Sequence, residues 1–235
     1  MKAMILAAGR GERMRPLTDA KPKPMLEAAG KPIIVWTIEA LARAGFRDLV
    51  INVSHFGQVI EQGLGDGRRW DVSIRYSREA EPLETAGGIA TALPLLGTEP
   101  FIVVNGDIYC DFDFRRLAGV LQTPAAPLAH LVLVNNPPHH PKGDFALDGC
   151  RVLNTGAPMY TFSGVGAYRP EFFGSVAPHT RAQLATLLRP QIDARRVTGE
   201  THGGAWSDIG TPERLYALET MLEPAAAQAR AHGTP

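Results

Sequence analysis

Short apolar runs alternate with amphipathic segments through the first half of the chain. The run AMILAA ends at a glycine, and DLVINVS, VSIRYS and FIVVNGD follow later, each short enough for a strand of a buried sheet. The intervening segments PIIVWTIEALARAG, GQVIEQGLGDG and TAGGIATALPLL are predicted helices. This alternation over residues 1–107 is typical of a parallel sheet with helices on both faces.

The alternation loosens after residue 111. We predict strands in LAHLVLVN and TFSGVGAY, helices in EFFGSV and RAQLATLLRPQIDA, and a last amphipathic helix in PERLYALETMLE. The final PAAAQARAHGTP has no apolar period. The sequence therefore predicts a single α/β domain over residues 1–223, with a Rossmann-like, mostly parallel sheet and helices on both faces. A flexible C-terminal tail is expected over residues 224–235.

Composition and charge limit the partners that the chain can have. Lys and Arg number 24, as do Asp and Glu, so the net charge is zero, whereas a dedicated nucleic-acid-binding protein normally has a basic excess. No apolar run has the length of a membrane span, and the N-terminal run is too short for a signal peptide. Cys110 and Cys150 fit neither a zinc site nor a disulfide framework. These features predict a cytoplasmic protein without nucleic-acid or membrane partners.

The loop after the first strand concentrates positive charge. It holds Arg10, Arg13 and Arg15, and Lys23 follows between two prolines that restrict its backbone. Gly9 and Gly11 would let the main chain approach an oxyanion closely. The spacing matches neither the dinucleotide fingerprint nor a Walker A loop, and by itself it also fits a glycine turn with solvated arginines. A local basic cluster in a neutral chain favours a small anionic ligand.

Two aspartates are candidate metal ligands. Asp107 ends the apolar strand FIVVNGD at the same sheet edge as the glycine loop, and Asp208 lies in WSDIGTPE. Such oxygen ligands suit Mg²⁺, which usually takes one or two carboxylates and completes its shell with phosphate and water. Each aspartate could equally serve only its local turn. His139 and His140 have no third ligand at a sensible spacing, so we predict no metal site there.

In order and spacing, LAAGRGERMRPLT, EPLETAGGI, VNGD and WSDIGTPE resemble the motifs of the sugar-phosphate nucleotidyltransferases over residues 1–222. The resemblance implies that the glycine loop wraps a nucleoside triphosphate, that Arg15 and Lys23 neutralise it, and that Asp107 and Asp208 hold Mg²⁺. These four residues are the predicted catalytic residues. The base would lie beside EPLETAGGI, although that segment alone also fits a loop and a helix capped by Thr85. The predicted nucleotide-binding residues are Ala8, Gly9, Gly11, Glu12, Arg13, Lys23, Glu81, Thr85, Gly87 and Gly88.

The acceptor half departs from the hexose-1-phosphate members of that family, because their V-x-E-K-P stretch is absent. NNPPHHPKGDFALDG followed by TFSGVGAY instead resembles the N-acetylmuramate-1-phosphate uridylyltransferases of bacterial peptidoglycan recycling. This resemblance implies UTP and N-acetyl-α-muramate 1-phosphate as substrates. It also implies a sugar-phosphate site at Asn105, Gly143 and Asp144. A cation for the lactyl carboxylate could come from Lys142, Arg181 or Arg189.

Two other functions stay open at this point. The same chemistry could act on GTP with mannose 1-phosphate or on dTTP with glucose 1-phosphate, or the chain could be a non-catalytic nucleotide-binding regulator. Two carboxylates favour an enzyme, since a binding module does not need both. We expect a monomer or a small homo-oligomer, because no hexapeptide array follows the domain. The prolines of residues 136–160 indicate a loop that could close over the sugar.

Overall fold

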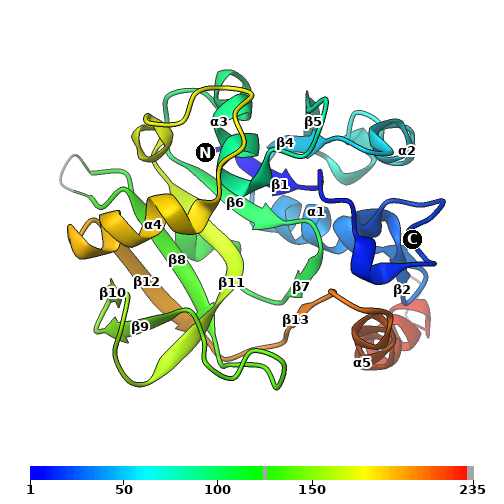
Figure 1. Cartoon of the computed structure of the whole chain (residues 1–235). Helices are drawn as coiled ribbons and strands as arrows, with labels where there is room; N and C mark the ends of the chain where they lie inside the picture. The colour runs from blue at the N-terminus through cyan, green and yellow to red at the C-terminus, as the bar shows by residue number, and fades with distance from the viewer. Residues whose placement is uncertain (124–125, 232–235) are drawn as a thin grey trace.

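A computed structural model of the chain describes residues 1–123 and 126–231 and has a nine-stranded sheet at its centre (Figure 1). In spatial order the strands are β5 (Ser73–Arg78), β4 (Asp48–Val53), β1 (Ala3–Leu6), β6 (Phe101–Asn105), β11 (Met159–Tyr168), β8 (Ala129–Val134), β12 (Val197–His202), β10 (Arg151–Leu153) and β9 (Phe145–Asp148). The predicted α/β class is confirmed by this sheet and the helices that cover it.

The first four strands run parallel, as the alternating pattern predicts. Leu6 of β1 is in register with Asn52 of β4 and with Asn105 of β6, so these strands end at the same edge of the sheet. Beyond β6 the neighbours are antiparallel except for β8 and β12. The sheet as a whole is therefore mixed rather than mostly parallel, because antiparallel neighbours need no crossover helix and the later half of the chain lacks the regular alternation.

Helices cover both faces of the sheet, as predicted. The helices α1 (Ile33–Arg43) and α2 (Gly57–Leu64) pack on one face, and α3 (Glu84–Leu96) and α4 (Leu184–Asp193) on the other. Successive residues of β1 point to opposite faces, so Ile5 packs with Ile38 of α1 while Met4 packs with Ile89 of α3. The central strands are consequently buried on both sides, which explains why their sequences are continuous apolar runs.

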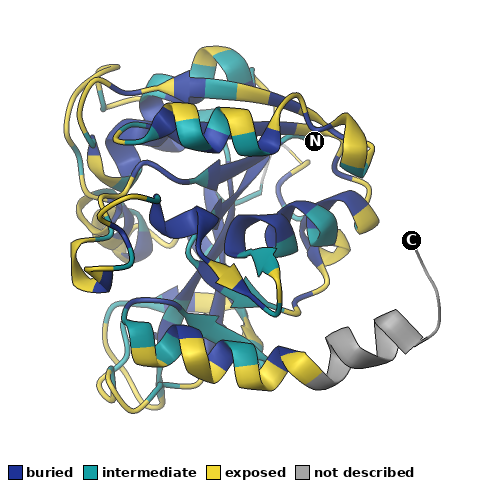
Figure 2. Cartoon of the chain, turned by 90° about the vertical axis from the view of Figure 1, so that its right-hand side faces the viewer, coloured by how far each residue is buried: buried dark blue, intermediate teal, exposed yellow. Residues whose placement is uncertain are grey.

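The helix α5 (Pro212–Ala231) runs along the lower side of the molecule in Figure 2, with buried and exposed residues alternating along its described part. Its residues Leu215, Leu218 and Leu222 form a third apolar cluster with Met14 and Leu26, among others. This confirms the amphipathic helix predicted at PERLYALETMLE. The helix continues through Ala231, into the segment predicted as a tail, and residues 232–235 lie outside the described residues. The flexibility of that segment stays a prediction.

The prediction of a helix over EFFGSV is wrong. The structure has only a short 3-10 turn, η5 (Pro170–Phe173), since both phenylalanines pack into the core against Tyr168 and Gly174 ends the turn. The other 3-10 turns are η1 (Glu12–Met14), η2 (Lys23–Met25), η3 (Arg68–Trp70) and η4 (Phe114–Leu117). None of the described helices is both long and apolar enough to cross a membrane.

Several short strands have no recognisable hydrophobic pattern in the sequence. The strands β2 (Glu27–Ala28) and β3 (Lys31–Pro32) pair with each other, and β7 (Ile108–Cys110) pairs with β13 (Trp206–Asp208). These segments, like β12 with the sequence VTGETH, are too short or too polar to show an alternating pattern. The β7–β13 pair matters most, because it joins the two predicted metal-ligand segments.

Candidate active site

A pocket of about 470 Å³ opens where the parallel strands end. Ligands of open parallel sheets bind at this edge, beyond the carboxyl ends of the strands. The sequence-predicted residues that line it are Ala8, Gly9, Gly11, Glu12, Arg13, Lys23, Thr85, Asn105 and Asp107. The lining also includes residues that sequence reasoning missed, among them Asn52, Glu79, Glu84 and Gly210. One pocket thus gathers the glycine loop, Lys23 and the end of β6.

The glycine loop folds tightly against the segment that carries Lys23. Gly11 has φ +66°, and a Cβ there would lie 3.0 Å from the Cβ of Lys23 and 3.1 Å from the Cγ2 of Thr18. The Thr18 hydroxyl donates to the Gly11 carbonyl at 2.9 Å. Glycine is therefore required at position 11 both by the left-handed backbone and by this close approach.

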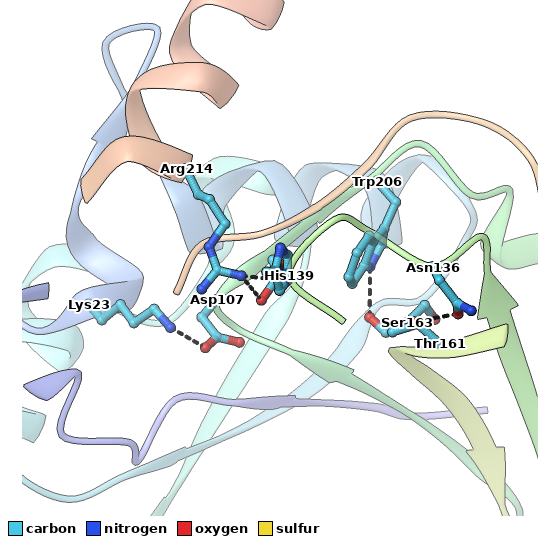
Figure 3. A network of polar contacts seen from close by, with 9 residues as sticks. Lys23, Asp107, Asn136, His139, Thr161, Ser163, Trp206 and Arg214 are labelled. Atoms are coloured by element: carbon cyan, nitrogen blue, oxygen red, sulfur yellow. Dashed lines mark hydrogen bonds and ion pairs between the residues drawn. The ribbon is translucent and has the colours of Figure 1, made fainter. Parts of the chain in front are cut away.

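Lys23 and Asp107 form a direct ion pair. The Nζ of Lys23 donates to Oδ2 of Asp107 at 2.5 Å, and Figure 3 shows the lysine side chain reaching toward the end of β6. The Lys23 side chain is only 10% exposed, against 37% for Asp107. A buried ammonium group needs such a partner, because desolvation of an unpaired charge is costly. Two of the predicted catalytic residues are thus in contact, although they lie far apart in the sequence.

Asp208 reaches the same place through the β7–β13 pair. It is in register with Ile108, and the amide of Ile209 donates to the carbonyl of Asp107 at 2.9 Å. Asp107 directly precedes this small antiparallel ladder and Asp208 ends it, so both residues lie at the same end, although Asp208 itself does not line the pocket. Sequence alone could not show this pairing, since neither strand has a recognisable pattern.

Two basic side chains hold the Asp208 carboxylate. Arg214 donates to its Oδ2 at 2.6 Å, and Nε2 of His139 lies 3.1 Å from its Oδ1. Figure 3 shows the side chains of Arg214 and His139 next to each other. Arg214 comes from the first turn of α5 and also contacts Nε2 of His139 at 2.7 Å. Arg214 passes so close to Gly210 that a side chain there would collide with the guanidinium. Sequence reasoning missed Arg214, whose only signal is an arginine shortly after the candidate carboxylate.

The carboxylates suit a metal held jointly with a ligand. Within the described residues, no group of three or more His, Cys, Asp or Glu side chains gathers as potential metal ligands. Mg²⁺ usually takes one or two carboxylates and completes its shell with phosphate oxygens and water. Asp107 and Asp208 are two such carboxylates, each paired here with a basic side chain, and their role as Mg²⁺ ligands stays a prediction. His140 contributes elsewhere, since its Nε2 lies 3.0 Å from Oδ1 of Asp144.

Arg15 does not line the pocket. Its side chain is 71% exposed, and its Nε lies 3.3 Å from Oδ1 of Asp19. Exposed ion pairs of this kind contribute little to stability, so the guanidinium could exchange Asp19 for a phosphate at small cost. The catalytic role of Arg15 stays a prediction.

The start of α3 forms another wall of the pocket. Glu84 and Thr85 line it, whereas Glu81 is exposed and does not. The helix begins at Glu84, so Thr85 lies inside the first turn rather than at its cap. Glu84 has φ +61°, a left-handed conformation that is uncommon for residues other than glycine. Arg181 donates to Glu84 at 2.6 Å, so among the three candidate cations it is the one paired with a pocket residue.

Gly87 and Gly88 act through close packing instead of lining the pocket. A Cβ at Gly87 would collide with the carbonyl oxygen of Thr180, and one at Gly88 would lie 2.7 Å from Oε1 of Glu79. The amide of Gly87 also donates to the carbonyl of Ala182 at 3.2 Å. The structure thus gives both glycines a packing reason, and their predicted contacts with a nucleotide stay untested.

We expect Gly87→Ala to destabilise the fold. The new methyl group would meet a backbone carbonyl that cannot move aside by a rotamer change, and such overpacking typically costs about 1–3 kcal/mol. Urea unfolding measures the loss, with Gly119→Ala as the control because a Cβ at Gly119 has open space around it. Equal stabilities of the two variants would contradict the packing role.

Asn105 lies where β6 meets a bulge in β11. The pairing of β11 with β8 shifts between Phe162 and Val165, and a Cβ at Gly164 would come within 2.7 Å of the Asn105 amide nitrogen. The Trp206 indole donates to the carbonyl of Ser163 at 2.9 Å. Bulges often occur next to active sites, where they redirect a strand. Of the predicted sugar-site residues, Asn105 is the one that lines the pocket.

Gly143 and Asp144 lie outside the pocket lining, in the turn that precedes β9. Oδ2 of Asp144 accepts from the Phe162 amide at 2.8 Å, and Gly143 has φ +64°. Asn136 accepts a hydrogen bond from Thr161 at 2.9 Å (Figure 3). Its side-chain amide donates to the carbonyl of Pro141 in the turn and to that of Met159 at the start of β11. This network ties the proline-rich turn to β11.

The two remaining candidate cations for the lactyl carboxylate are solvent-exposed. Lys142 is exposed in the proline-rich turn, and Arg189 is exposed on α4, where it contacts the side-chain oxygen of Asn154 at 3.4 Å. Neither of them lines the pocket. Their predicted contact with the sugar stays a prediction.

The comparison with known proteins identifies the family. Residues 2–146 match the family model described as nucleotidyl transferase. The chain belongs to the nucleotidyl transferase family. It is 53% identical over 226 residues to the N-acetylmuramate alpha-1-phosphate uridylyltransferase of Neisseria meningitidis serogroup B, and the match covers 94% of this chain and 98% of that protein. The resemblance inferred from the sequence motifs is thereby confirmed.

More distant relatives differ in length and in the activity that their names state. A mannose-1-phosphate guanyltransferase of Gibberella zeae is 39% identical over 91% of this chain, but the match spans only 62% of that enzyme. Among solved structures, the inositol-1-phosphate CTP transferase from T. maritima superposes with a TM-score of 0.76 at 19% identity, covering 94% of this chain and 95% of that chain. This likeness supports the nucleotidyl transferase fold alone.

Proposed function

We propose that this nucleotidyl transferase moves UMP from UTP to N-acetyl-α-muramate 1-phosphate, giving UDP-N-acetylmuramate and pyrophosphate, in the cytoplasm and as part of peptidoglycan recycling. The observation that carries the proposal is the nearly full-length match, at 53% identity, to a relative whose name states the same sugar phosphate and a uridylyl group. The pocket supports it, because it joins a glycine loop, a buried lysine and a strand-end carboxylate at one edge of the sheet.

The reaction is an in-line displacement at the α-phosphorus. A phosphate oxygen of the sugar 1-phosphate forms a new bond to this phosphorus while the bond to the pyrophosphate oxygen breaks. The attacking oxygen is already anionic, so no general base is required. The protein then acts by positioning the two phosphates and by neutralising charge. Lys23 can offset the charge that grows on pyrophosphate, and the amides around Gly9 and Gly11 can contact the phosphate oxygens.

We further propose that Asp107 and Asp208 hold Mg²⁺. When bound, the metal supplies charge neutralisation and orientation at the phosphates. Asp107 directly precedes β7 and Asp208 ends β13, so the two residues lie at the same end of this strand pair, where Lys23 and Arg214 pair with their carboxylates. On this proposal Arg15 leaves Asp19 to join the triphosphate.

Pyrophosphate release tests the proposal directly. Four nucleoside triphosphates should be crossed with N-acetylmuramate, N-acetylglucosamine, glucose and mannose 1-phosphates, each with and without Mg²⁺. We expect turnover confined to UTP with the muramate phosphate and dependent on the metal. Turnover with another pair would overturn the substrate assignment while keeping the chemistry, and no turnover in any pair would favour a binding protein.

A second candidate is the transfer of GMP to mannose 1-phosphate. It is favoured by the 39% identity to the mannose-1-phosphate guanyltransferase of Gibberella zeae. That enzyme extends well beyond the matched region, whereas the uridylyltransferase relative does not. The GTP and mannose 1-phosphate arm of the same assay distinguishes the two functions.

A further inference from the structure

A chain of buried hydrogen bonds connects two walls of the pocket. The amide of Ala7 donates to Oδ1 of Asn52 at 2.8 Å, and the Asn52 side-chain amide donates to Oε1 of Glu79 at 2.7 Å. The amide of Leu83 then donates to Oε2 of Glu79 at 3.1 Å. Asn52 is 3% exposed and Glu79 is 6% exposed. The chain runs from the end of β1, beside the glycine loop, to the segment just before α3.

The donors at both ends determine which side chains can complete this chain. Both end groups are backbone N–H groups, so Asn52 must present its oxygen to Ala7 and Glu79 must present an oxygen to Leu83. The contact in the middle then needs one donor and one acceptor. An asparagine facing a glutamate satisfies this rule, whereas an asparagine facing a glutamine would bring two N–H donors together.

The pair is covered on one side by α3 and carries a burial cost. A Cβ at Gly88 would lie 2.7 Å from Oε1 of Glu79 and 2.8 Å from Nδ2 of Asn52, so the helix backbone rests directly on the pair. No Lys or Arg within residues 1–123 and 126–223 forms an ion pair with Glu79, and burial raises the pKa of its carboxyl group. Hydrogen bonds from Asn52 and Leu83, and not a cation, offset the cost of burying this carboxylate, so it depends on the positions of the two segments that supply those donors.

We propose that Asn52 and Glu79 are positioning residues that set the spacing between the glycine loop and the segment 79–85, and so determine how tightly the nucleoside part of the substrate is held. Ala7 directly precedes the glycine loop, and Leu83 directly precedes the pocket residues Glu84 and Thr85. The hydrogen bonds of Asn52 and Glu79 involve neither Lys23 nor Asp107, which pair with each other. This inference rests on the proposed function, because it takes the ligand to be a nucleoside triphosphate.

Exchanging the two functional groups provides the test. Glu79→Gln places two donors in contact, and Asn52→Asp places two acceptors in contact. The double variant N52D/E79Q restores every hydrogen bond, because the new side-chain amide at position 79 donates to the new carboxylate at position 52. We expect each single variant to raise KM for UTP about tenfold or more while kcat changes less, because one buried polar group loses its partner. The double variant should return KM to within about threefold of the original value.

Binding and stability measurements keep the outcomes distinct. Calorimetric titration with UTP, in the presence of Mg²⁺, should show the same loss and recovery of affinity without requiring turnover. If the unaltered protein binds UTP but transfers no UMP to the muramate phosphate, the proposed function fails while the pair is still tested by binding. Single variants that unfold more easily but bind UTP normally would overturn the positioning role, as would a double variant no better than the single ones.

Discussion

Replacing Asp107 by asparagine should lower the rate of pyrophosphate release from UTP and N-acetyl-α-muramate 1-phosphate by at least about 10²–10³-fold. The amide keeps the shape of the side chain but removes the negative charge that pairs with Lys23 at 2.5 Å and that would hold Mg²⁺. Both changes act on the reacting phosphates, so the lower rate should appear mainly as a lower kcat. Initial rates at saturating substrates, measured over a range of Mg²⁺ concentrations, provide the test.

Asp148→Asn is the matched control for this variant. Asp148 is exposed at the end of β9 and lies outside the pocket lining, so the same change of charge should leave the rate within about twofold. Thermal unfolding of Asp107→Asn is needed as well, because the variant leaves the buried Lys23 without its anionic partner. A folded Asp107→Asn protein with an unchanged rate would remove Asp107 from the mechanism.

Lys23→Met should lower kcat by about 10²–10³-fold while retaining the fold. Methionine preserves the length of the aliphatic stem, which packs against the glycine loop at Gly11, but it lacks the ammonium group that would neutralise the departing pyrophosphate. Because the Lys23 side chain is only 10% exposed, a cation from the solvent cannot readily replace the lost ammonium group. Single-turnover measurements at saturating UTP separate this loss from any change in nucleotide binding.

Lys21→Met offers a control two positions away in the same basic segment. Lys21 pairs with Glu27 at 2.8 Å, and the two side chains are 40% and 53% exposed, so its charge is screened by solvent. We expect kcat of this variant to remain within about twofold of the original. Equal losses for the two lysine variants would mean that the segment acts through its overall charge and not through the contact of Lys23 with Asp107.

The fold is predictable from sequence where local patterns are strong. The strands β1, β4, β5 and β6 and the helices between them follow from apolar runs and helical spacing, and their alternation predicts the parallel pairing that the structure shows. The second half of the sheet could not be deduced in this way. The strands β9, β10 and β12 are short or polar, and their partners are set by contacts across distant parts of the chain.

The same distinction between local patterns and distant contacts applies to the predicted site residues. Glycine spacing and a strand-end aspartate indicate a phosphate-binding edge, and Gly9, Gly11, Lys23 and Asp107 all line the pocket there. Gly143 and Asp144, predicted from resemblance to lie at the sugar, lie in the turn before β9, where Asp144 bonds to β11. A motif match locates a residue in the chain, but the direction of its side chain depends on neighbours that the motif does not contain.

The sequence by itself determined the family and the alternating first half and predicted a phosphate-binding edge, because each single motif behind them consists of residues close together along the chain. The tertiary structure alone decided that Asp208 joins Asp107, that Arg214 and His139 hold Asp208, and that Asn52 and Glu79 bridge the two walls of the pocket. Arg214 lies six residues from Asp208, but the other contacts join residues distant in sequence. Asp208 comes beside Asp107 through the pairing of β7 with β13, and Asn52 and Glu79 meet where β4 and β5 end side by side. Register and burial decide them, and neither can be read from local spacing.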